Sequence, residues 1–264
     1  MLKRYIRLYL VYLKNHLKVM MEYRGDFLIG MSSVLIQQFT SVFFVGVVFQ
    51  HIEEINGWSF YEILFIYAIA MLGRSIHHIF FDNLWTLGWQ YVKNGNFDRI
   101  LIRPLNPLFQ VCAERLQQDG IGQLLIGLIV LFTATSNLDI IWSLSSIVML
   151  LVLIISSGFI FVSVNLFFIT LSFWMVDSLP IVWAIFNLSE FTRYPLTIYN
   201  KGIAFILTWL IPYGFTAFYP ASYFIEHSGY RVFALWTPAV AIISCVISYK
   251  FWTMGVKAFT STGS

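Results

Sequence analysis

Long apolar runs that carry very few charges constrain this chain more than any other feature of its sequence. Several runs exceed the about 18–20 residues that an α-helix needs to cross the hydrocarbon core of a bilayer. Of the 264 residues, 59% are hydrophobic and 11% are charged, whereas about 25% of the residues of a soluble domain are charged. Backbone groups in lipid must satisfy their hydrogen bonds internally, so such runs form helices. We therefore expect an all-α, polytopic membrane protein with one transmembrane domain over residues 1–264.

The hydropathy pattern predicts six transmembrane helices. These spans cover about residues 27–50, 62–81, 116–134, 142–172, 202–218 and 232–252. Ser59 and Glu62 form a capping-box pattern where the second span begins. Pro212 and Gly214 interrupt the fifth span. We expect residues 173–201, which are amphipathic and contain prolines, to form a helix and turn on the cytosolic side before that span.

Residues 2–22 predict an amphipathic helix that precedes the first span. At about 100° per residue, one polar sector collects Lys3, Arg4, Arg7, Lys14, Asn15, Lys18 and Glu22. Aromatic and aliphatic residues cover most of the remaining circumference. A basic stripe opposite an apolar face is typical of a helix that lies in the membrane interface, attracted by anionic lipid headgroups.

The distribution of Lys and Arg predicts the orientation in the membrane. With six spans and both termini in the cytosol, nearly every Lys and Arg falls on the cytosolic side, Arg193 and Lys201 included. Arg231 falls outside and Arg74 lies within a span. Cytosolic loops of membrane proteins carry an excess of basic residues, so this topology is the expected one.

A charged island of turn residues, 94–107, separates the second and third predicted spans. Gly95 can take a left-handed turn, and Asp98 can cap a short helix that begins there. Pro104 and Pro107 would end that helix, because the residue before a proline is disfavoured in α space. The result would be a short cytosolic helix that offers charged side chains to a partner: Asp98, Arg99 and Arg103. An ordinary solvated loop is the alternative.

Polar residues inside the predicted spans are candidates for a translocation path or for contacts between spans: Gln37, Gln38, Arg74, His78 and Asn165. Helix packing is the alternative for the two glutamines, because amides in a membrane find partners on neighbouring helices. A structural network in which Arg74 snorkels toward the cytosolic end is the alternative for that residue.

Several chemistries lack their sequence patterns. The chain has no phosphate-binding loop of the Gly-x-x-x-x-Gly-Lys-Ser/Thr type, so we expect no ATP and no other cofactor on it. Adjacent His77 and His78 are a weak metal pattern, and we expect no metal site. Cys112 and Cys245 suit packing better than a disulfide framework. The dispersed basic residues do not indicate nucleic-acid binding.

Three segments together resemble one family. Residues 95–107, in the pattern Gly-x-Phe-Asp-x-x-Leu-x-Arg-Pro-x-x-Pro, resemble the motif after the second span in permeases of the type-2 ATP-binding-cassette (ABC) exporter family. The likeness is to a bacterial branch whose members often occur as paired permeases. The second segment is similar to that branch's motif of Arg, Tyr, Pro and then Tyr, and comprises Glu190, Arg193, Tyr194, Pro195 and Tyr199. Residues 211–212 and 219–221 resemble its proline-containing fifth span and outer turn.

The resemblance implies a function and partners. It implies a permease that dimerises with itself or a sister permease in the bacterial plasma membrane, each copy docking an ABC ATPase that carries ATP and Mg. Residues 2–22 would be the elbow helix, and 82–115 the cytosolic coupling segment. The coupling residues would be Asn94, Gly95, Phe97, Asp98, Arg99, Arg103 and Pro104. Weakly charged, aromatic-rich spans favour export of an amphiphilic or hydrophobic small molecule by alternating access.

Two other functions remain open at this point. A secondary transporter or channel usually carries ionisable residues at mid-membrane, and here only Arg74 qualifies, with no acidic partner expected in a span. A lipid-modifying enzyme would need a cluster such as Glu190, Arg193 and Tyr194. We expect those three residues to form a structural turn, and we expect no enzyme.

Overall fold

The computed structural model describes residues 2–260, which are almost entirely helical. The longer helices are α1 (Leu2–Glu22), α2 (Arg24–Phe49), α3 (Phe60–Phe80), α6 (Asp119–Thr135), α7 (Leu144–Thr170) and α11 (Arg231–Ala258). The shorter helices are α4 (Phe97–Leu101), α5 (Pro107–Ala113), α8 (Leu179–Leu188), α9 (Lys201–Phe205) and α10 (Phe218–Ser222). Strands β1 (Glu54–Ile55) and β2 (Trp58–Ser59) form one small antiparallel hairpin.

Single turns of other helix types connect these elements. The 3-10 turns are Asp82–Thr86, Leu171–Phe173, Ser189–Arg193, Leu196–Ile198, Tyr213–Thr216 and Glu226–Ser228. The π-helical turns are Leu87–Lys93 and Ile206–Leu210.

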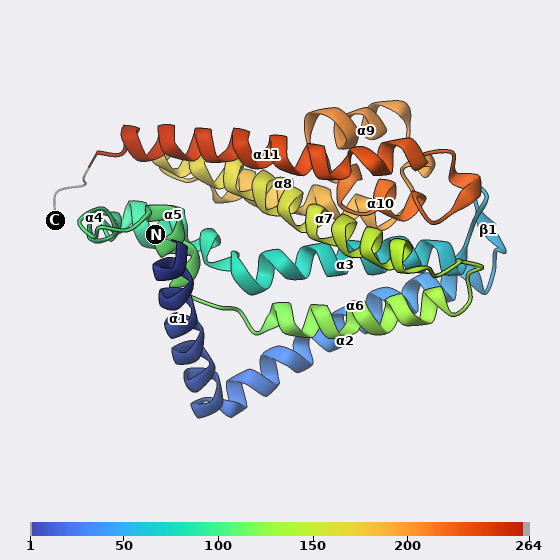
Figure 1. Cartoon of the computed structure of the whole chain (residues 1–264), viewed down its shortest axis with the longest axis horizontal. Coiled ribbons are helices and arrows are strands. Elements are labelled where there is room, and N and C mark those ends of the chain that lie inside the picture. The colour runs from blue at the N-terminus through green and yellow to red at the C-terminus, as the bar shows by residue number, and fades with distance from the viewer. Residues whose placement is uncertain (1, 261–264) are drawn as a thin grey trace.

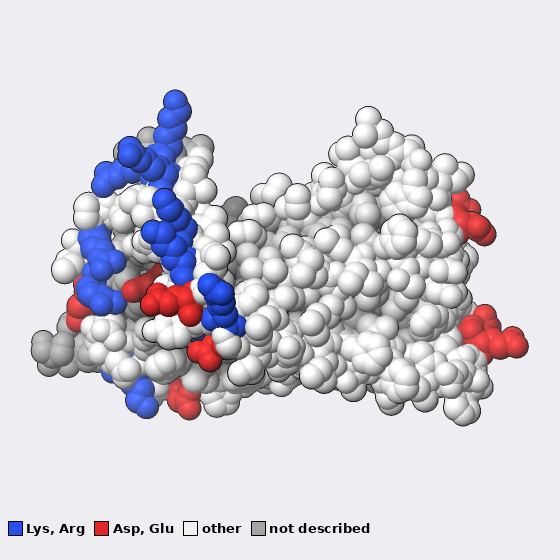
Figure 2. Space-filling model, turned by 90° about the horizontal axis from the view of Figure 1, so that it is seen from below, with Lys and Arg blue, Asp and Glu red and all other residues white. Residues whose placement is uncertain are grey.

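The long helices run side by side, so the molecule has two distinct ends (Figure 1). One end carries α4, α5 and the last turns of α11, with α1 lying across the bundle axis (Figure 1). Lys and Arg side chains gather there in Figure 2, and we call it the basic end. The β1–β2 hairpin lies at the opposite end, which we call the hairpin end.

Within residues 2–260, four helices are long and apolar enough to cross a membrane: α2, α3, α7 with the 3-10 turn that follows it, and α11. They lie where the first, second, fourth and sixth spans were predicted. Helix α6, where the third was predicted, has 17 residues and runs between the same two ends. These helices confirm an all-α, multi-pass membrane protein. The capping box predicted at the start of α3 is present, with the Ser59 amide donating to Glu62 at 2.8 Å.

Glycines let the central helices approach closely, as small residues do in membranes. A Cβ at Gly120 of α6 would lie 2.6 Å from the backbone nitrogen of Ile79 on α3. A Cβ at Gly158 of α7 would lie 2.5 Å from the Ile76 side chain. Helix α3 is therefore held between α6 and α7, and most of its side chains are buried.

Residues 202–218 do not form the single membrane-spanning helix that we expected. They comprise α9, a π-helical turn, a break at Ile211–Pro212, a 3-10 turn and the start of α10. The chain before this segment and the end of the segment both lie at the hairpin end, next to Trp58. The Trp58 indole donates to Thr197 Oγ1 at 2.9 Å, and its ring lies 5.6 Å from that of Phe218. Proline lacks the amide that would continue a helix, so the chain turns back and forms a re-entrant hairpin.

The segment that joins the two ends is instead residues 178–198, which we had expected on the cytosolic side. Its beginning lies near the basic end, where the Ser178 hydroxyl is 2.7 Å from that of Ser172. Its end reaches Trp58 at the hairpin end through Thr197. The ten residues of α8 rise about 15 Å, and the next five, in a 3-10 turn, rise about 10 Å. The expectation that Arg193 and Lys201 lie with the basic residues of the opposite end is therefore wrong.

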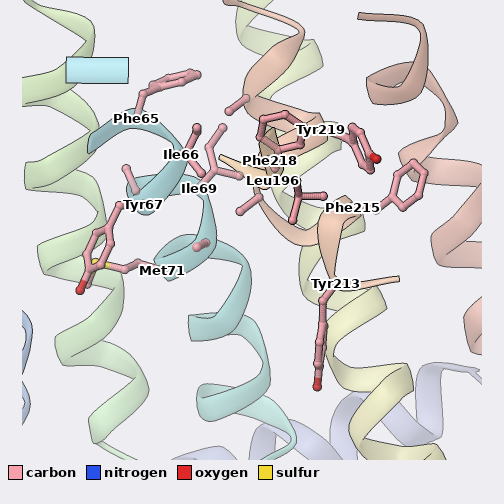
Figure 3. Packing of buried hydrophobic residues seen from close by; sticks show 14 of the residues in the cluster. Phe65, Ile66, Tyr67, Ile69, Met71, Leu196, Tyr213, Phe215, Phe218 and Tyr219 are labelled. Atoms are coloured by element: carbon pink, nitrogen blue, oxygen red, sulfur yellow. The ribbon is translucent and has the colours of Figure 1, made fainter. Parts of the chain in front are cut away.

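The largest apolar core lies where the re-entrant hairpin meets α3. Ile66 and Ile69 of α3 point toward Leu196 and Phe218, as Figure 3 shows. Phe218 and the two isoleucines are almost fully buried. Close van der Waals packing stabilises contacts between apolar side chains within a membrane, so the re-entrant hairpin is a packed part of the bundle.

Candidate functional site

The segment between α3 and α6 forms a compact unit at the basic end that includes the predicted short helix, α4. Gly95 has a φ of 70°, the left-handed turn expected from the sequence. Asp98 lies in the first turn of α4, whereas Asn96 occupies the N-cap position. Pro107 begins α5 and does not end α4, because Asn106 caps α5 by accepting from the Phe109 amide at 3.2 Å. The predicted roles of Asp98 as cap and Pro107 as terminator are therefore wrong.

Phe97 attaches α4 to the ends of two long helices. Its side chain is 0% exposed. Its ring centroid lies 5.1 Å from that of Phe173, after α7, and 6.2 Å from that of Trp252 in α11. Phe259, just past α11, is 5.0 Å away. This motif residue is therefore a buried anchor that packs α4 against the ends of α7 and α11.

Three side chains that were not among the predicted site residues hold this unit together: Gln110, Glu114 and Tyr91. Gln110 of α5 donates to the carbonyls of Ile100 and Leu105, at 3.0 and 3.1 Å. Arg99, at the surface of α4, pairs with Glu114 at 3.2 Å. Tyr91 also donates to Glu114, and burial together with that carboxylate raises the pKa of the Tyr91 phenol well above its ordinary value. The only sequence hint was the polar character of residues in an otherwise apolar chain.

The outer tip of the unit is exposed and carries both charged and apolar side chains. The predicted coupling residues Asn94, Arg103 and Pro104 are exposed, and Asp98 is half-buried. Between them, the Ile102 side chain is 82% exposed. We call Leu101–Pro104 the exposed tip. Ile102 thus adds an apolar side chain to the charged surface that the tip presents, and it was not among the coupling residues predicted from the sequence.

A second group of predicted residues meets inside the bundle. Arg74 of α3 donates to Glu190 and, at 2.8 Å, to the Ser189 hydroxyl. Arg193 pairs with the other oxygen of Glu190 at 2.7 Å. We call these four residues the Arg74–Glu190 cluster. Arg74 is 6% exposed and six residues from the end of α3, which is about 9 Å along a helix. The expectation that Arg74 has no acidic partner in a span is therefore wrong.

Aromatic rings surround the two guanidinium groups. The Arg74 guanidinium lies 5.4 Å from the ring centroid of Phe161 and 5.2 Å from the ring centroid of Phe186. That of Arg193 lies 5.2 Å from the ring of Tyr67, whose hydroxyl donates to Gln38 of α2 at 2.8 Å. Cation–π contacts stabilise a desolvated guanidinium. The cluster thus ties α3 to α2, α7 and the segment after α8.

The other predicted polar residues stay outside this cluster. Gln37 is exposed on α2. Asn165 is buried in α7, where its amide donates to the carbonyl of Phe161 at 2.8 Å. His78 pairs with Asp82 at 2.7 Å, nearer the basic end.

The remaining motif residues shape the chain after Arg193, as expected of a structural turn. Tyr194 has an extended backbone, and Pro195 precedes the 3-10 turn Leu196–Ile198. The Tyr199 hydroxyl donates back to the carbonyl of Phe191 at 2.9 Å. These contacts fix the turn that carries Glu190.

One comparison with known proteins found a match. A family model described as ABC-2 family transporter protein matches residues 35–263, a range that includes both the coupling segment and the Arg74–Glu190 cluster. No curated protein and no solved structure matches the chain. The family model covers most of the chain. The protein therefore belongs to the ABC-2 transporter family, as the multi-pass membrane permease of an ABC transporter that works with an ATPase subunit.

Proposed function

We propose that this permease pairs with a second permease and two ABC ATPase subunits, and exports an amphiphilic or hydrophobic small molecule across a bacterial plasma membrane. ATP and Mg would be bound by the ATPase subunits. The observation that carries the proposal is the geometry of α4. Its neighbouring tip, Leu101–Pro104, is exposed, while Phe97 is anchored against the ends of α7 and α11.

The charge distribution supports an orientation with the basic end in the cytosol. Lys and Arg gather at the end that carries α4 (Figure 2), and basic residues are retained on the cytosolic side of membranes. Six segments would then cross: α2, α3, α6, α7, residues 178–198 and α11. Both termini and the exposed tip would face the cytosol, where ATP is available to a partner ATPase.

The surface of α1 supports its assignment as an interfacial elbow helix. Tyr5 faces the protein, where its ring lies 4.8 Å from that of Phe109 and its hydroxyl accepts from the Asn106 amide. Ile6, Leu10 and Leu17 are exposed beside the basic stripe. A helix with adjacent apolar and basic stripes suits the boundary between acyl chains and anionic headgroups.

The buried anchor supplies a route for coupling. When the ATPase subunits bind ATP and close, the docked tip would move with them, and Phe97 would pass that displacement to α7 and α11. The ATPase must bind the two permease conformations with different affinities, because only differential binding shifts such an equilibrium. Rigid-body movement of packed helices is a common form of this response.

The exposure of Glu190 supports a permease dimer. Its side chain is 38% exposed although it lies within the bundle, next to exposed Trp183, Asn187 and Phe191. A carboxylate that faces lipid at this depth would be costly. We infer that this face of α8 turns toward a second permease and the central path, where aromatic and amide side chains suit an amphiphilic molecule.

The proposal can be tested by reconstitution in proteoliposomes. The permease and its cognate ABC ATPase should together move a fluorescent amphiphile in an ATP-dependent way. An ATPase variant that binds but does not hydrolyse ATP is the matched control and should abolish movement. Movement driven by an ion gradient without the ATPase would contradict the proposal and favour a secondary transporter.

A further inference from the structure

His77 is a buried polar residue to which the proposed function gives no role. It lies one turn before the end of α3 and is 0% exposed. Neither ring nitrogen has a hydrogen-bond partner among the described residues. The ring packs edge-on against Phe161 and His78, with centroids 5.2 and 5.3 Å away. Buried polar atoms are normally paired, so two unpaired nitrogens on one side chain require an explanation.

Two further metal-ligating residues lie beside it. His77, His78 and Asp82 each offer one ligand atom, and these atoms all lie within 4.8 Å of one another. Two ligands on one zinc ion lie up to about 4 Å apart, because each Zn–N bond is about 2.0–2.1 Å long. Small side-chain rotations would therefore bring all three onto one ion. The adjacent histidines alone were a weak pattern, and the residue that completes the group is Asp82, four positions after His78.

The local charges also suit a cation. Asp119, at the start of α6, is close enough to Asp82 for the two carboxylates to repel each other. Arg74 opposes a positive charge at His77 but is paired with Glu190, and the positive charge of Arg115 acts on Asp119. The partial exposure of His78 and Asp82 leaves an approach from the surface. A divalent ion would satisfy His77 and relieve the repulsion between the carboxylates.

We propose that His77, His78 and Asp82 form a binding site for one divalent transition-metal ion, with zinc as the best match. Two imidazoles and a carboxylate are a zinc donor set that leaves a fourth position open. The site spans the joint between α3 and the 3-10 turn at Asp82–Thr86. A bound ion fixes the orientation of the coupling segment relative to α3, which adds regulation by metal availability to the proposed transport function.

The test is metal binding by the purified full-length permease, without an ATPase and without a histidine tag. Titration with zinc against a chromophoric chelator gives stoichiometry and affinity, and cobalt substitution reports the coordination geometry. The key variant is His77→Phe, which keeps an aromatic ring beside Phe161 and removes both nitrogens. His78→Ala and Asp82→Asn remove the other ligands, and His51→Ala, on an exposed residue at the hairpin end, is the control.

We expect one zinc ion per chain, with an affinity that falls at least about tenfold in each of the three variants, since even outer-shell partners are worth about 10–100-fold. His51→Ala should bind as the unmodified protein does. Absence of stoichiometric binding, or equal binding by His77→Phe, would overturn the proposal. A purely structural His77 predicts a different result: His77→Phe would raise the thermal midpoint with and without zinc, because it removes unpaired buried nitrogens.

Discussion

The guanidinium group of Arg74 on α3 pairs with the carboxylate of Glu190, which lies 116 residues later in the chain. Arg193 pairs with the same carboxylate. The Glu190 carboxylate is thus the shared partner of two guanidinium groups within the bundle, so the three residues do not contribute equally to stability. Loss of Arg74 leaves Glu190 with a partner, whereas loss of Glu190 leaves two guanidinium groups facing each other.

Glu190→Gln should therefore destabilise the permease more than Arg74→Gln does. Removal of one partner from a buried pair costs about 3–5 kcal/mol of unfolding free energy. Because the Glu190 side chain is 38% exposed, we expect Glu190→Gln to lower the free energy of unfolding by less than this general figure, by about 2–3 kcal/mol. The loss in Arg74→Gln should be smaller still. Chemical unfolding in mixed micelles measures the difference, with the exposed Glu53→Gln at the hairpin end as control. A larger loss in Arg74→Gln would contradict this assignment of the shared counter-charge.

The re-entrant hairpin predicts which side of the membrane Lys201 faces. Lys201 follows Thr197 by four residues, and Thr197 contacts Trp58 at the hairpin end. A cysteine at Lys201 should therefore react with a membrane-impermeant maleimide from outside the cell. Cysteines at Asn137 and Gly229 should react likewise, whereas one at Asn96 should react only after permeabilisation. If Lys201→Cys is labelled only after permeabilisation, residues 202–218 cross the membrane and the hairpin is wrong.

Burial of Cys112 predicts that its thiol is inert. Desolvation raises the pKa of this thiol from 9.0 to about 12. A raised pKa keeps the unreactive protonated form to higher pH, so at pH 8 the thiolate fraction falls by about a thousandfold. In a Cys245→Ala background, alkylation of Cys112 should be undetectable under conditions that fully modify Arg103→Cys. Comparable rates for the two thiols would show that α5 is not packed as described.

Features that depend on neighbouring residues could be predicted from the sequence. The amphipathic pattern of α1, the long apolar helices, the capping box at Ser59 and the turn at Gly95 all follow from residue spacing or local backbone preference. The polar island between α3 and α6 was predicted to hold a short helix because turn residues flank it. Each of these follows from interactions within a few turns of the chain.

Features that depend on distant residues could not be predicted. The partner of Arg74 is far away in the sequence, and Glu190 lies in a segment broken by Pro180 and Pro195. The α-helical part of that segment is apolar but has only ten residues, and Glu190 and Arg193 follow it. No apolar run there reaches the about 18–20 residues that mark a span. The burial of Phe97 likewise depends on Phe173 and Trp252 from other helices, and no local pattern indicates it.

If the exposed tip docks the ABC ATPase, substitutions in the tip should lower the affinity of the ATPase for the permease. The double variant Ile102→Ala with Arg103→Ala removes an apolar side chain that is 82% exposed and a fork-shaped cation suited to carboxylates. The matched control is Ile141→Ala with Asp139→Ala at the hairpin end, where Ile141 is 88% exposed. Neither pair contributes to the buried core, so both proteins should insert and fold.

The measurement is the dissociation constant of the ATPase for each permease variant in nanodiscs. We predict that the tip variant weakens binding at least about tenfold, or about 1.4 kcal/mol, and that the control binds as the unmodified permease does. Equal affinity for the tip variant, the control and the unmodified permease would rule out the exposed tip as the docking site, because the ATPase would then dock elsewhere or not at all.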